Sequence, residues 1–190
     1  MAKKKNTPKS KQVITAKRSI TNEIENLLNT QIIMEGTSSA YYLSMASWCH
    51  TKGYDYSSKF LYRHSEEERM HMLKLFRYVN DAGGHALQPE ITDIKHTFKS
   101  LREVFNLILS HEIAVTKSIN KIVDHCFSIK DFTTFNFLQW YVTEQREEET
   151  LARRAVELFD LIGEAGIGLW TIDQEIGKLD SFAANAAPEN

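Results

Sequence analysis

The sequence predicts an all-α protein, namely a four-helix bundle with a long crossover between its second and third helices and a short fifth helix at the C-terminal end. Two observations lead to this fold class. Four long segments carry apolar residues at every third or fourth position, which is the spacing of one buried helix face. Glycines and short polar turns separate the segments, and only one connection, between the second and third, is long.

The first two helices are predicted to form a tight hairpin. The first covers roughly residues 18 to 50 and ends near Lys52-Gly53; the second begins within a few residues and ends at Gly83-Gly84. Because the turn is so short, the two helices should lie antiparallel. About 16 residues that include Pro89 follow. At about 3.3 Å per residue they reach along a whole helix, so the third helix should run parallel to the second.

The rest of the chain adds a second hairpin and one short helix. The third helix begins near Phe98 to Leu101, and a tight turn from Ser128 to Asp131 leads into the fourth, for which Asp131 is a favourable N-cap. Glycines then interrupt the chain before an apolar-spaced stretch that predicts the fifth helix: Leu169, Ile172, Ile176 and Leu179. A helix this short is not stable alone, so it must pack on a neighbour.

The composition indicates a single helix-rich domain. The chain has 190 residues, of which 42% are hydrophobic and 25% charged, and this suffices to bury a core. We assign residues 18–180 to this domain, residues 1–17 to a flexible lysine-rich tail and residues 181–190 to a flexible C-terminal tail. The two cysteines, Cys49 and Cys126, occupy apolar helix positions and are expected to be buried and reduced.

The charge pattern points to a cytoplasmic protein. The formal net charge is -2, so neither nucleic acid nor membrane is an expected partner. No apolar run approaches the roughly 20 residues that span a bilayer. The N-terminal lysines have no apolar segment behind them, unlike a secretory signal.

Six polar residues occupy apolar helix positions, and their spacing repeats. The residues 33 and 36 positions after Glu35 are Glu68 and His71, and those 33 and 36 positions after Glu112 are Gln145 and Glu148. Members of each pair lie three apart and share a helix face, so both point to the same interior. A single glutamate would more often be solvated, but six matched positions argue against that reading. No lysine or arginine occupies the nearest helix positions, so two divalent cations are expected, with iron, manganese or zinc suited to the ligands.

Around these residues the sequence resembles the bacterial non-haem ferritins. The similarity extends from about residue 18 to 180 and is carried by EGTSSAYY (35–42), RHSEEERMHM (63–72), His111-Glu112 and FLQWYVTEQREEE (137–149). The resemblance implies that one iron is held by Glu35, Glu68 and His71. It implies a second iron on Glu68, Glu112 and Glu148, with Glu68 as the bridge and Gln145 nearby.

The resemblance also implies features around this pair of irons. A third iron would lie on Glu67, Glu144 and Glu147, with Glu148 shared. Tyr42 follows Glu35 by seven residues on the same helix face. It either takes part in the centre, by hydrogen-bonding it or by lending an electron, or serves as a core tyrosine. Haem is not expected, because haem-binding relatives have a methionine directly after the bridging glutamate, where this chain has Arg69.

These residues predict a ferroxidase that serves iron storage. Gln145 is a weaker ligand than a carboxylate, so the second iron should be held less firmly, which suits a centre that oxidises iron and passes it on. We expect two ferrous ions to be oxidised by dioxygen, or by peroxide, at a di-iron centre within one subunit. The resemblance implies that ferric iron is stored as a mineral in a hollow shell of twenty-four copies, with the fifth helix at the four-fold axes.

Two other functions remain open. A rubrerythrin-like di-iron oxidase would be expected to have two Glu-x-x-His motifs, whereas this chain has one. The other is a DNA-protecting miniferritin, because the N-terminal tail is rich in lysines: Lys3, Lys4, Lys5, Lys9 and Lys11. Miniferritins, however, build their iron site between subunits and lack a terminal fifth helix.

Overall fold

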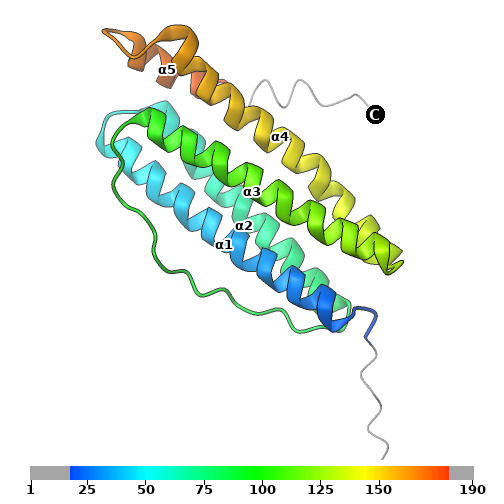
Figure 1. Cartoon of the computed structure of the whole chain (residues 1–190). Coiled ribbons are helices and arrows are strands. Elements are labelled where there is room, and N and C mark those ends of the chain that lie inside the picture. Colours follow the sequence, from blue (N-terminus) through cyan, green and yellow to red (C-terminus); the bar gives the residue numbers. More distant parts are fainter. Residues whose placement is uncertain (1–17, 180–190) are drawn as a thin grey trace, which may run out of the picture.

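The computed structural model describes residues 18–179, and over this range the protein is an all-α bundle without strands. Two antiparallel hairpins pack together, and a short helix closes one end (Figure 1). The helices are α1 (Asn22–Thr51), α2 (Asp55–Asp81), α3 (Leu101–Ser128), α4 (Phe132–Ile162) and α5 (Gly168–Ile176). The fold class predicted from the sequence is confirmed. The tails assigned to residues 1–17 and 181–190 lie outside the described residues.

Three of the long helices begin at a side chain that accepts a backbone N–H, as their sequences lead one to expect. Thr21 caps α1 by accepting from the amide of Ile24, and Ser100 caps α3 in the same way. Asp131 caps α4, as predicted, and accepts from the amide of Thr134. Such caps satisfy backbone donors that have no partner within the helix, so they set where each helix starts.

The crossover between α2 and α3 runs along the length of α1 (Figure 1). It lets α2 and α3 run in the same direction, as predicted. Asn29 of α1 holds its near end, donating from Nδ2 to the carbonyl of His85 at 3.0 Å and accepting from the amide of Leu87 at 2.9 Å. Midway, Pro89 packs so closely on Gly36 that a Cβ there would lie 2.9 Å from the proline Cγ.

The bundle core consists of two apolar regions. One, near α5, contains Trp48, Phe105 and Phe159. The other, at the opposite end, contains Leu28 and Leu75. Between them, each long helix contributes buried polar residues to one layer. The candidate site is therefore a polar layer enclosed above and below by apolar side chains.

The short helix α5 is present where the sequence predicts it, and it packs on the bundle. Ile172, Ile176 and Leu179 are buried in the apolar region nearest to it. Cys49 and Cys126 are buried free thiols, as expected. Among the described helices, none combines the length and apolar character needed to cross a membrane.

Candidate metal centre

All six polar residues selected by their spacing converge in the buried layer. Glu35 comes from α1, Glu68 and His71 from α2, and Glu112 from α3; Gln145 and Glu148 come from α4. Each is buried, because the helical period turns every one of them inward at the same height of the bundle. The layer thus brings four carboxylates, one imidazole and one amide into an interior that water does not reach.

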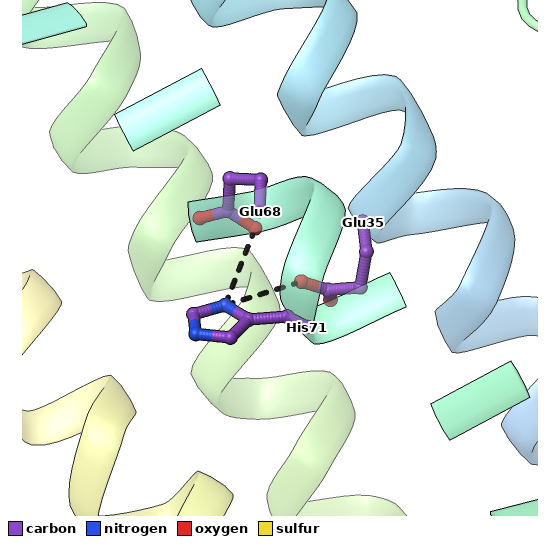
Figure 2. Close-up of side chains that lie close together, drawn as sticks. All are labelled: Glu35, Glu68 and His71. Atoms are coloured by element: carbon purple, nitrogen blue, oxygen red, sulfur yellow. Dashed lines mark ion pairs between the residues drawn. The ribbon is translucent and has the colours of Figure 1, made fainter. Parts of the chain in front are cut away.

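Glu35, Glu68 and His71 form a ready-made ligand group (Figure 2). The Nδ1 of His71 lies 3.7 Å from Oε2 of Glu68 and 4.0 Å from Oε2 of Glu35. These same three atoms have no hydrogen-bond partner, although all three are buried. An unpaired buried polar atom is costly, and one divalent cation at their centre would satisfy all three. The group therefore fits a metal ion.

Glu112 is held by neutral donors on both of its oxygens. The Tyr42 hydroxyl donates to Oε1, while Nε2 of Gln145 donates to Oε2 at 3.2 Å. Gln145 thus presents its amide nitrogen to the carboxylate in this structure. Tyr42 is a hydrogen-bond donor to the centre, which is one of the two roles that the sequence left open. Burial, followed by the charges of Glu112 and Glu68, raises the pKa of Tyr42 well above its usual value, so the phenol stays protonated.

The clustered carboxylates favour protons over negative charge. Burial, followed by the charge of Glu148, raises the pKa of Glu112 to about 7, although its hydrogen bonds with Tyr42 and Gln145 act in the opposite direction. Burial and the charges of Glu35 and Glu112 raise the pKa of Glu68 well above its usual range. Metal binding must therefore displace protons from this layer.

A second group of possible ligands lies beside the first: His64, Glu67 and Glu148. Nδ1 of His64 is 3.4 Å from Glu67 Oε2 and 3.3 Å from Glu148 Oε2. Burial lowers the pKa of His64, but the hydrogen bond and charge of Glu148 outweigh it and the pKa is raised. His64 received no role from the sequence. Its position one turn before Glu68 on the same buried face was the available signal.

The glutamates expected to hold a third iron divide between two environments. Glu67 and Glu148 belong to the second group, whereas Glu144 Oε1 lies 3.6 Å from Nε2 of His71. This contact with His71 lowers the pKa of Glu144. Glu147 is exposed, and burial followed by the charges of Glu144 and Glu148 raises its pKa. The outer glutamates therefore lead from the surface toward both groups.

Two aromatic rings pack beside His71. Trp140 and Tyr141 are stacked with centroids 4.5 Å apart, and their centroids lie 5.5 and 5.4 Å from the imidazole. Both rings are tilted by 51° to the imidazole, so they contribute apolar contacts beside the ligand group. Sequence reasoning identified neither ring as a neighbour of His71.

Comparison with known proteins identifies the family. Residues 25–162 match the model of the ferritin-like domain. The chain is 45% identical over 160 residues to a bacterial non-haem ferritin of Campylobacter jejuni, covering 84% of this chain and 96% of that one. It is 38% identical over 162 residues to a bacterial non-haem ferritin of Escherichia coli, covering 84% and 96%.

Solved structures agree with this. An open-pore ferritin from the archaeon Archaeoglobus fulgidus superimposes with a TM-score of 0.80 at 38% identity, over 84% of this chain and 97% of that one. The fold, the buried ligand group and these relatives lead to one conclusion: the chain belongs to the ferritin family, among the bacterial non-haem ferritins.

Proposed function

We propose that this protein is an iron-storage ferroxidase of the cytoplasm. It oxidises ferrous iron with dioxygen inside each subunit, and the ferric product is stored as a mineral within a shell of identical copies. The observation that carries this proposal is the convergence of three buried, unpartnered ligand atoms on Glu35, Glu68 and His71. Iron is the substrate of this reaction and passes through the site.

The first ferrous ion binds the group of Glu35, Glu68 and His71, because no hydrogen bond to their three free ligand atoms has to break first. The second binds Glu68, Glu112 and Glu148, so that Glu68 bridges the pair. Two ferrous ions each lose one electron, and one dioxygen molecule takes up both electrons together with two protons from water and leaves as hydrogen peroxide. Protons held by Glu68 and Glu112 are released when the cations bind, because a carboxylate cannot keep its proton and serve as an anionic ligand.

The second iron position is the weaker of the two. Its ligand Glu112 already bonds Tyr42 and Gln145, so those contacts must loosen or adjust when the cation binds. The first group has no such competition at its three free atoms. A firm position next to a loose one suits a site that must release its product.

We assign the group of His64, Glu67 and Glu148 to a third iron in transit. The distances from the His64 imidazole to the carboxylates of Glu67 and Glu148 are short enough for the three side chains to share a cation. Glu148 also connects this group to the second iron position. We propose that Glu144, which lies beside His71, and the exposed Glu147 supply further oxygen ligands. Iron would then enter or leave along the acidic side of α2 and α4.

The enclosure requires other copies of the chain. Three apolar side chains near α5 are strongly exposed: Leu161 at the end of α4 (70%), Ile167 just before α5 (72%) and Trp170 on α5 (62%). Apolar side chains this exposed are typical of an interface. We propose that α5 packs against copies of itself around the four-fold axes of a twenty-four-subunit shell.

The two alternative functions receive less support. The first ligand group comes from α1 and α2 of one chain, whereas a miniferritin would build its iron site between subunits. A rubrerythrin-like centre would have a second histidine where this chain has Glu148.

The direct test is to add ferrous iron in air to the purified apoprotein. We expect rapid ferric absorbance in proportion to the protein, followed by growth of particle mass through added iron. The matched variant Glu68→Ala should lose the rapid phase while still assembling. A wild-type rate no faster than that of buffer alone would refute the ferroxidase, and a monomeric particle would refute storage.

A further inference from the structure

Gln31 is fully buried one helical turn before Glu35 on α1. Its side-chain amide Nε2 donates a hydrogen bond to Oε1 of Glu35. The other oxygen of that carboxylate, Oε2, has no hydrogen-bond partner and faces Nδ1 of His71. Gln31 thus occupies one oxygen of Glu35 and leaves the other for a cation.

The orientation of this amide is itself fixed from a different helix. The Ser118 hydroxyl of α3 donates to Oε1 of Gln31 at 2.5 Å. With its oxygen engaged by Ser118, Gln31 can offer only its N–H group to the carboxylate. If the amide turned over, its oxygen would face a carboxylate oxygen, and two acceptors repel. Ser118, Gln31 and Glu35 therefore form a directed chain of hydrogen bonds across α3 and α1.

This arrangement is specific to the first half of the centre. In the second half, the residue four positions before Glu112 is Ile108, which belongs to the apolar core. Glu112 instead has both oxygens engaged, by Tyr42 and Gln145. Glu35 thus keeps one carboxylate oxygen without a hydrogen-bond partner, whereas Glu112 keeps none.

We propose that Gln31 is a positioning residue that makes Glu35 a one-oxygen ligand and turns its Oε2 toward His71 and Glu68, with Ser118 fixing the amide of Gln31. Without this donor, Glu35 would rotate freely or engage a cation through both oxygens, and the preorganised geometry would be lost. The inference rests on the proposed metal centre and adds the reason why its first position binds firmly.

The test is an anaerobic titration of the assembled apoprotein with Co(II), whose visible absorption reports ligand number and geometry. Gln31→Leu should bind the first Co(II) about 10- to 100-fold more weakly, as is usual when the hydrogen-bond partner of a ligand is removed, and should change the spectrum. Ser118→Ala should weaken binding less, and Ser118→Thr, which retains the hydroxyl, should restore it.

Two matched controls separate positioning from packing. Gln139→Leu removes a glutamine of α4 that bonds the carbonyl of Phe135 within its own helix, and Ser110→Ala removes a hydroxyl of α3 that bonds the carbonyl of Asn106. Both should leave Co(II) affinity and spectrum unchanged. Glu35→Ala should abolish the first binding step and thereby identify it.

The outcomes distinguish this inference from the proposed function. Wild-type Co(II) affinity and spectrum in Gln31→Leu would overturn the positioning role. If Gln31→Leu does not fold, an unchanged affinity in Ser118→Ala overturns it equally. Normal Co(II) binding by a wild-type protein that fails to oxidise iron would refute the ferroxidase and leave the role of Gln31 standing.

Discussion

Glu112 shows most directly how a residue chosen for function opposes folding. It is a carboxylate in an apolar part of α3, close to the negative charge of Glu148. Burial and that charge raise its pKa to about 7, so in the absence of metal it is partly protonated at neutral pH. A cation would supply the charge compensation that the apoprotein obtains from a proton.

The first prediction at this scale concerns the stability of the apoprotein. In the folded state Glu112 binds its proton more tightly than in the unfolded chain, because its pKa rises from 4.5 to about 7. The stability of the wild type therefore falls as the pH rises from 4.5 through about 7. Glu112→Gln lacks this titration. Its free energy of unfolding should therefore rise relative to wild type across that interval, by on the order of 3 kcal/mol. Denaturant unfolding of both apoproteins at several pH values measures the difference; parallel curves would contradict it.

The same substitution should have the opposite effect on function. Glu112→Gln removes an anionic ligand of the proposed second iron, and neither Tyr42 nor Gln145 replaces its charge. We expect the rapid oxidation of iron pairs to slow by about tenfold or more. Stopped-flow measurement of ferric absorbance checks this, with the assembled particle confirmed beforehand. A wild-type oxidation rate would remove Glu112 from the site whatever the stability does.

At the scale of elements, α5 supplies the N-terminal cap of α2. The N-terminus of α2 has no cap from its own Tyr54, and the Asp173 carboxylate of α5 takes that place. It accepts from the amides of Tyr56 at 3.2 Å and Ser57 at 2.8 Å. A negative charge at a helix N-terminus also interacts favourably with the helix dipole. The short helix is thereby tied to the helix that carries Glu68 and His71.

Removing this contact should destabilise the fold. Asp173→Ala leaves the half-buried amide of Tyr56 and the buried amide of Ser57 without this acceptor. The loss should cost about 1–2 kcal/mol, which differential scanning calorimetry would register as a lower melting temperature. Glu175→Gln alters an exposed contact with Lys178, which lies just after α5, and should change the melting temperature little. Equal melting temperatures for Asp173→Ala and Glu175→Gln would mean that the cap contributes nothing.

At the scale of the whole molecule, the isolated subunit leaves apolar surface that folding alone does not bury. The side chain of Trp170 on α5 is 62% exposed, and Ile167 just before it is 72% exposed. The proposed packing of α5 against copies of itself would bury both side chains, whereas a monomer would leave them in water.

The last prediction tests this surface. Trp170→Glu places a charge where copies of α5 are proposed to meet, and we expect a particle of much lower mass by multi-angle light scattering, because burying an unpaired charge is unfavourable. Trp170→Phe, which keeps the apolar contact, should retain the wild-type mass. A full-size particle from Trp170→Glu would place the interface elsewhere.

The sequence by itself determined the helices, their order and the six inward-facing residues. These features depend on local periodicity and on caps within a few residues, so Asp131 and the spacing of Glu35, Glu68 and His71 suffice to predict them. The exact helix ends were less certain. The first helix starts at Asn22 because Thr21 caps it, and the expectation of a start near residue 18 was too early.

Only the tertiary structure decided which atoms meet. Asp173 caps α2 from more than a hundred residues away, Ser118 orients Gln31 across two helices, and His64 joins Glu67 and Glu148. Such partnerships depend on side-chain rotamers and on how the helices pack, which no local pattern encodes. Periodicity indicates which residues face the interior, but the packing of four helices decides which of their atoms remain without a hydrogen-bond partner and can take up the proposed metal ion.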